Sequence, residues 1–129
     1  MNQESRKIKS FTDLETWQIG HSLTLEIYQL TKTFPKEEMF SLTSQLRRAA
    51  VSFTSNIAEG FSRQYYKEKV QFYSVALGSL TEIQNQLLVS RDVGYVNYED
   101  FKKSADKTVV LNKMTNSLIR KSRSKFLDS

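Results

Sequence analysis

The sequence contains no cysteine and a single histidine. A chain without thiols forms no disulfide, zinc finger or cysteine-ligated iron–sulfur site, and one imidazole excludes any site that needs two. Only four glycines and one proline occur in 129 residues, although tight turns depend on these residue types. This scarcity argues against an all-β barrel or sandwich, and the length suits a single domain with its own core.

Long apolar runs are also missing. No stretch approaches the ~18 apolar residues of a membrane-spanning helix, and the first ten residues, MNQESRKIKS, hold no apolar segment typical of a signal peptide. We therefore expect a cytoplasmic protein without a membrane segment.

The net charge of +5 comes from the two ends of the chain. Residues 11–119 carry 12 basic and 12 acidic side chains, so the whole excess lies in residues 1–10 and 120–129. We predict a basic N-terminal tail (1–10), a folded domain (11–119) and a basic C-terminal tail (120–129). Basic tails suit an anionic partner, although mixed surface charge also serves solubility.

Four segments repeat apolar residues with helical periodicity. The first runs from Thr12 to just before Phe34, and the third from about Tyr65 to Asp92. The expected caps and stop signals are Thr12 with Glu15, Ser41, Gly94, and Asn97 with Asp100. Short connections make successive helices antiparallel neighbours, so the sequence predicts an all-α, antiparallel up-down-up-down four-helix bundle.

The first helix has two apolar stripes on nearly opposite sides. One holds Leu14, Trp17, His21, Leu25 and Tyr28, and the other Ile19, Leu23, Ile27, Leu30 and Phe34. A bundle interior covers one stripe, whichever it is, so the other predicts a closed homo-oligomer. The expected core includes Trp17, Tyr28, Leu46, Phe53, Ile57, Phe72, Leu80, Ile83 and Leu118.

Candidate catalytic groups are few. His21 lies on an apolar stripe, where a hydrogen-bonded core histidine is a better interpretation than a general base. Glu59 and Glu82 are interpreted either as a carboxylate pair or, in preference, as an ion-pair network with Arg48. Gly-rich phosphate-binding and nucleophile-elbow motifs are absent. We expect no enzyme activity, no metal site and no cofactor.

Five segments taken together resemble one family: FTDLETWQ (11–18), FPKEE (34–38), LTSQLRRAA (42–50), SNIAEG (55–60) and GSLTE (78–82). In this order they are similar to the four-helix bundle proteins of the 23S rRNA intervening-sequence family. The resemblance implies a bacterial, left-handed, homopentameric bundle of no established biochemical role. It also implies kinship with accessory proteins of diversity-generating retroelements, which are thought to bind nucleic acid. Where the family has a proline before SNIAEG, this chain has Thr54, so its second helix is expected to run straighter.

Two functions follow from these observations. The first is an oligomer that binds RNA or other nucleic acid, and the alternative is a homo-oligomeric protein-interaction scaffold. Arg47 and Arg48 fit either ion pairs or phosphate contacts, and Gly78, costly in a helix, suggests a close helix or subunit contact. The candidate nucleic-acid-binding residues are Arg47, Arg48, Arg63, Lys67, Arg120, Lys121, Arg123 and Lys125.

Overall fold

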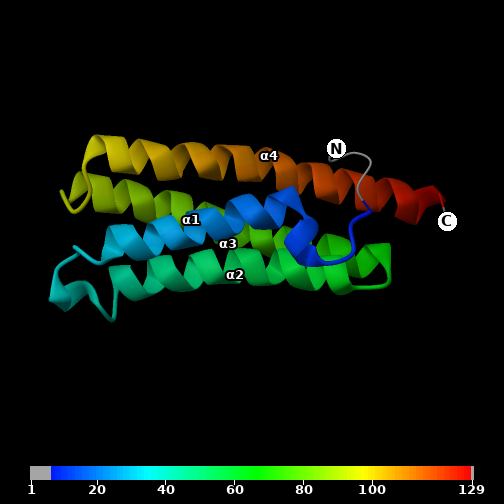
Figure 1. Cartoon of the computed structure of the whole chain (residues 1–129), viewed down its shortest axis with the longest axis horizontal. Coiled ribbons are helices and arrows are strands. Elements are labelled where there is room, and N and C mark those ends of the chain that lie inside the picture. The colour runs from blue at the N-terminus through cyan, green and yellow to red at the C-terminus, as the bar shows by residue number, and fades with distance from the viewer. Residues whose placement is uncertain (1–6, 129) are drawn as a thin grey trace.

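Four α-helices and two short 3-10 helices make up residues 7–128, the part of the chain that this computed structural model describes, and no strand occurs among them. In chain order the elements are η2 (Phe11–Asp13), α1 (Glu15–Thr31), η3 (Lys36–Glu38), α2 (Leu42–Ser62), α3 (Tyr66–Asp92) and α4 (Tyr98–Asp128). The helices lie side by side, and each runs opposite to the one before it (Figure 1). The predicted all-α four-helix bundle is confirmed.

The start of the first helix differs from the prediction. Thr12 does not cap it; instead the Thr12 backbone N–H donates to Ser10 Oγ at 3.3 Å, and the Ser10 N–H donates to Asp13 Oδ2 at 3.1 Å. This capping box encloses η2, and α1 begins at Glu15 with no side-chain cap. The Thr12–Glu15 box is wrong because a Ser-x-x-Asp pattern two residues earlier satisfies the same kind of turn.

The other predicted signals are mostly confirmed. The Asp100 N–H donates to Asn97 Oδ1 at 2.8 Å, so Asn97 caps α4. Gly94 has φ +84°, and the Tyr95 N–H reaches back to the Ser90 carbonyl at 2.9 Å, which ends α3 in a Schellman motif. Ser41 stands at the start of α2, but its hydroxyl hydrogen-bonds Glu38 Oε2 at 3.0 Å and caps no helical N–H.

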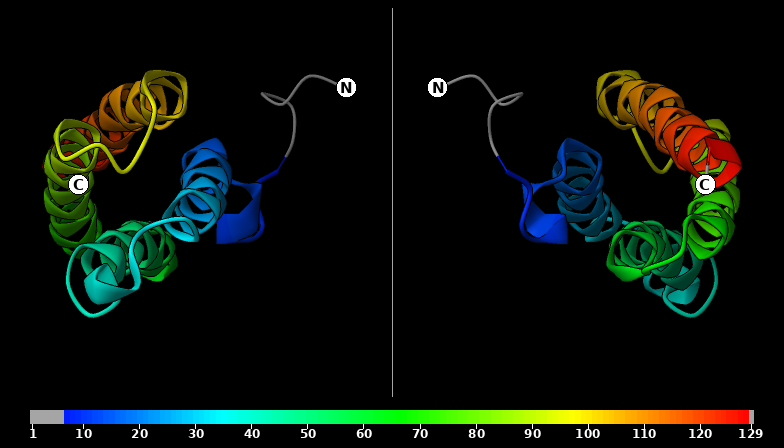
Figure 2. Two further views of the ribbon diagram at one scale, coloured as in Figure 1. Left: turned by 90° about the vertical axis from the view of Figure 1, so that its left-hand side faces the viewer. Right: turned by 90° about the vertical axis from the view of Figure 1, so that its right-hand side faces the viewer.

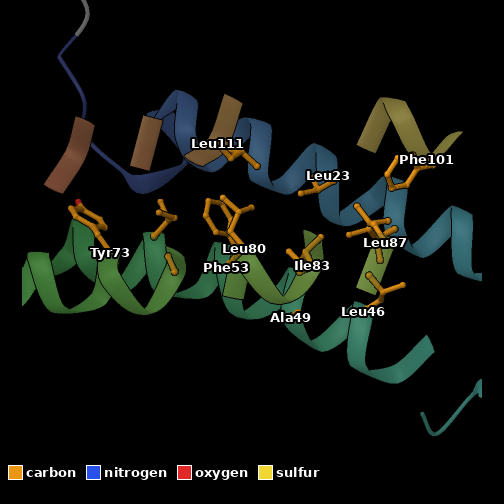
Figure 3. Close-up of a cluster of buried hydrophobic side chains, with 14 of the residues drawn as sticks. Leu23, Leu46, Ala49, Phe53, Tyr73, Leu80, Ile83, Leu87, Phe101 and Leu111 are labelled. Carbon is orange, nitrogen blue, oxygen red and sulfur yellow. The ribbon is translucent and has the colours of Figure 1, made fainter. Parts of the chain in front are cut away.

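The core lies along the inner faces of all four helices (Figure 3). Five of the predicted core residues are buried, namely Leu46, Phe53, Ile57, Leu80 and Ile83. Trp17 and Leu118 are half-buried and pack against the core. Phe72 is half-buried as well, with the Arg63 guanidinium over its ring. Tyr28 is 39% exposed, so its assignment to the core is wrong.

The structure decides which stripe of α1 faces inward. Leu23, Ile27 and Phe34 are buried, whereas Leu25, on the other stripe, is 55% exposed. His21 is also exposed and stacks on Trp17 with 4.7 Å between ring centres. The expectation of a core histidine is therefore wrong, because helical spacing alone left two apolar stripes equally eligible for burial.

Helix packing is uneven around the bundle. α2 packs extensively on α3, and α3 on α4, whereas α1 and α4 make the least extensive of the helix–helix contacts. Seen from its ends, the ribbons of α1 and α4 lie farther apart than those of α2 and α3 (Figure 2). Residues of α1, of α4 and of the connection between α3 and α4 line a groove there.

Helices α2 and α4 run without interruption. α2 is helical from Leu42 to Ser62, through Thr54; the straighter course expected for this helix stays a prediction. α4 continues past residue 119 into the segment expected to form a basic tail. Ser122 in that segment is buried, so residues 120–125 belong to the packed helix.

Candidate nucleic-acid interface

The eight candidate basic residues do not form one surface. Arg47 is half-buried between α1 and α2, where its Nε donates to Thr31 Oγ1 at 2.9 Å. Its guanidinium also lies over the Tyr28 ring, 4.8 Å from the ring centre. Arg47 therefore joins two helices of the same bundle, and its donors are partly occupied.

Arg48 lies on a different side of α2, in a shallow groove between α2 and α3 that Glu82 also lines. Among the described residues no ion pair joins Arg48 to either predicted partner, and Glu59 instead binds Arg63 with an N–O distance of 3.0 Å. The predicted Arg48–Glu59–Glu82 network is wrong because successive turns of α2 carry Arg48 and Glu59 to different levels of the bundle. Ser52 and Ser79 close the groove floor with a 2.8 Å hydrogen bond.

The remaining candidates lie around one end of the bundle, where α2 ends, α3 begins and α4 ends (Figure 1). Lys125 connects two of these segments, with its Nζ 5.8 Å from the centre of the Tyr66 ring. We call this region the basic end, defined by Arg63, Lys67, Arg120, Lys121, Arg123 and Lys125. Segments that are some 55 residues apart in the sequence thus share one surface.

Aromatic rings alternate with the cations at the basic end. The Arg63 guanidinium lies 4.6 Å from the centre of the Phe72 ring, and Tyr65 is 64% exposed. Cation–ring contacts fix the positive groups in place, and an exposed ring offers a flat surface on which a nucleobase can stack.

Sequence reasoning missed Lys69. Its Nζ donates to the carbonyl oxygens of Gly60 at 3.1 Å and Phe61 at 2.7 Å, which are in the last turn of α2. Burial lowers the pKa of this ammonium. Lys69 neutralises the negative end of the α2 dipole, a role that sequence spacing does not reveal because the lysine belongs to the following helix.

The free positive groups are fewer than the sequence count suggests. Arg63 is paired with Glu59, and Lys69 is engaged with carbonyls. Lys67, Arg120, Lys121 and Arg123 are exposed, and no ion pair within the described part of the chain involves them. These four cations are the ones available to an external anion.

Across residues 7–128, no three His, Cys, Asp or Glu side chains gather in a way that holds a metal ion. The described helices also include none long and apolar enough to span a membrane.

A family model described as the 23S rRNA-intervening sequence protein matches residues 12–117. The chain belongs to this family. A solved structure with a similar fold is a protein of unknown function from the S23 ribosomal protein family of Bacteroides thetaiotaomicron. It is 20% identical, the alignment covers 81% of this chain and 97% of that one, and the TM-score is 0.75. No curated protein matches the chain.

The basic end of this 23S rRNA-intervening sequence family protein extends beyond the family match. Arg63 and Lys67 lie inside the matched region, whereas Arg120 and the basic residues after it follow the last matched residue, 117. Neither the family description nor the structural neighbour's name states an enzymatic activity.

Proposed function

We propose that this protein is a non-enzymatic homo-oligomer that binds RNA or other single-stranded nucleic acid through phosphate contacts at its basic end. The observation that carries the proposal is that unpaired cations of α3 and α4 lie at the same end of the bundle as an exposed aromatic ring, Tyr65. Such a surface recognises a phosphate backbone and stacks bases without reading sequence.

Self-association is supported by the apolar surface that the single chain leaves in water. Leu25, Val75, Val109 and Phe40 are each about half exposed or more, and they are distributed over several elements. Oligomerisation covers such surface, and it repeats the basic end once per subunit, so weak phosphate contacts gain avidity.

The binding test is fluorescence anisotropy with a labelled single-stranded RNA of about 20 nucleotides, titrated at several salt concentrations from about 50 mM upward. If the four unpaired cations each contact one phosphate, log affinity falls against log salt with a slope of about −3, at roughly −0.7 per contact. Replacing Lys67, Arg120, Lys121 and Arg123 by glutamine should abolish most of the binding and flatten this slope.

A matched control removes the same number of charges elsewhere. Glutamine at Lys32, Lys36, Lys102 and Lys113, all exposed and outside the basic end, leaves the same net charge and should preserve most of the binding. Equal loss in both variants would show that only total charge matters. If the unaltered protein binds no RNA at low salt, the scaffold function gains support.

The scaffold alternative rests on its own observation. Phe40 is 96% exposed, and a fully exposed aromatic ring is a typical anchor of a protein–protein contact. Light scattering distinguishes self-association from a monomer of 15.0 kDa, and it is independent of any RNA measurement.

A further inference from the structure

Phe40 lies on a hydrogen-bonded turn that leaves its side chain in solvent. It follows η3, with 96% of its surface exposed, beside Met39, which is 44% exposed. The backbone around it is fixed, because the Met39 N–H donates to the Lys36 carbonyl at 3.1 Å and the Ser41 N–H to the Glu38 carbonyl at 3.0 Å. A large apolar side chain on a hydrogen-bonded turn is arranged to enter another surface.

A receptive surface lies between α1 and α4. The groove there has a volume of about 550 Å³, within the ~300–1,000 Å³ of pockets that enclose small organic ligands, so a benzyl group fits. Its apolar lining comes from Leu25, Leu30, Tyr95 and Val96. Leu25 is 55% exposed, which shows that the chain itself leaves this groove uncovered.

The polar part of the groove is rigid. Lys107 forms an ion pair with Glu26 and donates to Ser22 Oγ at 2.8 Å, and Ser104 donates to Glu26 Oε1 at 3.1 Å. These bonds join α1 to α4 along the groove. The groove is therefore a preformed feature, and binding there needs little reorganisation.

Phe40 and the groove lie at the same end of the bundle, and a residue near each carries a charge opposite to the other. η3 and the α3–α4 connection lie at the same end of the bundle (Figure 1), while η3 packs on α2, away from the α1–α4 side (Figure 2). Glu37 lies three residues before Phe40, and Lys103 lines the groove together with Asp100 and the paired Lys107 and Glu26. Neither Glu37 nor Lys103 makes an ion pair within residues 7–128, so Lys103 is free to pair with Glu37 of a second copy.

We propose that Phe40 of one copy inserts into the α1–α4 groove of the next, with Glu37 facing Lys103. Because the donor and the acceptor surfaces lie on different sides of one bundle, the contact is head-to-tail, and each copy uses both surfaces. This inference rests on the self-association in the proposed function and names the surfaces that produce it.

The first test replaces Phe40 by serine. The side chain makes little contact within its own chain, so Phe40→Ser should leave the thermal melt of the bundle unchanged. Self-association, measured by light scattering and sedimentation across a dilution series, should weaken at least about 30-fold, the factor expected for loss of an interface hot spot. Tyr65→Ser, which removes another exposed aromatic ring at the other end, should leave it unchanged.

The second test uses the absence of cysteine in the natural chain. Single variants Phe40→Cys and Val96→Cys should form a disulfide-linked dimer when mixed and oxidised, because a bridge requires Cβ atoms about 4 Å apart. Phe40→Cys mixed with Val75→Cys, which replaces an exposed valine of α3 outside the groove, should form little of it. Glu37→Lys should weaken self-association, and adding Lys103→Glu should restore it.

The results separate self-association itself from the contact proposed for Phe40. An unaltered protein that stays monomeric overturns the self-association and this inference together, while RNA binding is judged separately. An oligomer that survives Phe40→Ser and yields no 40–96 crosslink overturns the inference alone. Preferential crosslinking within one chain, in a Phe40→Cys and Val93→Cys double variant, would also overturn it, because the ring would then cover its own α2–α3 surface.

Discussion

At the basic end, side chains pack closely around the turn between α2 and α3, whereas at the opposite end backbone and capping hydrogen bonds organise the turns. Gly60 leaves room for the Tyr73 ring at the basic end, and Lys69 caps α2 from the next helix. At the opposite end, Gly94 and Asn97 end one helix and begin the next through local hydrogen bonds.

Their charges differ as well. Near the opposite end Arg91 pairs with Asp92 and Lys102 with Asp106 along one helix or its end, and Lys107 of α4 pairs with Glu26 of α1. At the basic end several cations stay unpaired. These differences fit the two proposals, in which the basic end binds anions and Phe40 at the opposite end contacts a neighbouring copy.

The largest difference between the ends should appear at alkaline pH. Burial raises the pKa of Tyr73 from 10.0 to about 12. Between these values the folded chain keeps a proton that the unfolded chain releases, so stability falls as pH rises, by roughly 3 kcal/mol in total. Urea unfolding from about pH 9 to 12 measures this fall.

Tyr73→Phe should remove the part of the stability loss at alkaline pH that comes from the buried phenol. Tyr98→Phe, an exposed tyrosine at the opposite end, should not. Lys69 contributes with the opposite sign, because its lowered pKa makes stability rise with pH below 10.5. An identical pH profile for the natural chain and Tyr73→Phe would contradict the burial of the phenol.

Gly60→Ala tests the packing of the basic end directly. A Cβ at this position would meet Tyr73 Cε1 at 2.5 Å, and overpacking a buried site costs about 1–3 kcal/mol. The midpoint of urea unfolding should therefore fall. Unchanged stability would mean that the Tyr73 ring moves aside at no cost.

Asn97→Ala tests the capping of the opposite end. Removing the Asn97 side chain takes away the acceptor for the Asp100 N–H, a loss of about 1 kcal/mol for a typical N-cap. Ser41→Ala is the matched control, because Ser41 caps no N–H of α2. Equal destabilisation by Asn97→Ala and Ser41→Ala would contradict the finding that Asn97 caps its helix and Ser41 does not.

Gly78→Ala should have the smallest effect, with the opposite sign. The sequence suggested a close contact at Gly78, but among the described residues nothing beyond its chain neighbours and the adjacent backbone of α3 lies within 4 Å of an added Cβ. Alanine should stabilise the isolated bundle by about 0.5–1 kcal/mol. A destabilisation that grows with protein concentration would instead place Gly78 against a neighbouring copy.

Local signals in the sequence predicted most of the fold. The Gly94 stop, the Asn97 cap and the apolar repeat around Phe53 and Ile57 each depend on residues within one or two turns, so the pattern is enough. Sequence patterns also identified the basic residues of the candidate site. They did not show which basic residues are free to bind an anion, because Arg47 and Lys69 donate hydrogen bonds to groups on other helices.

The sequence by itself determined a helical bundle, the approximate extent of its helices and the location of the excess positive charge, because these depend on periodicity, capping residues and composition. Only the tertiary structure decided which stripe of α1 is buried, that α3 and α4 bring their cations to one end, and that the α1–α4 groove stays uncovered opposite an exposed Phe40. The physical reason is that these features depend on how helices far apart in the chain rotate and pack, and helical spacing within one segment carries no information about the neighbour it will meet.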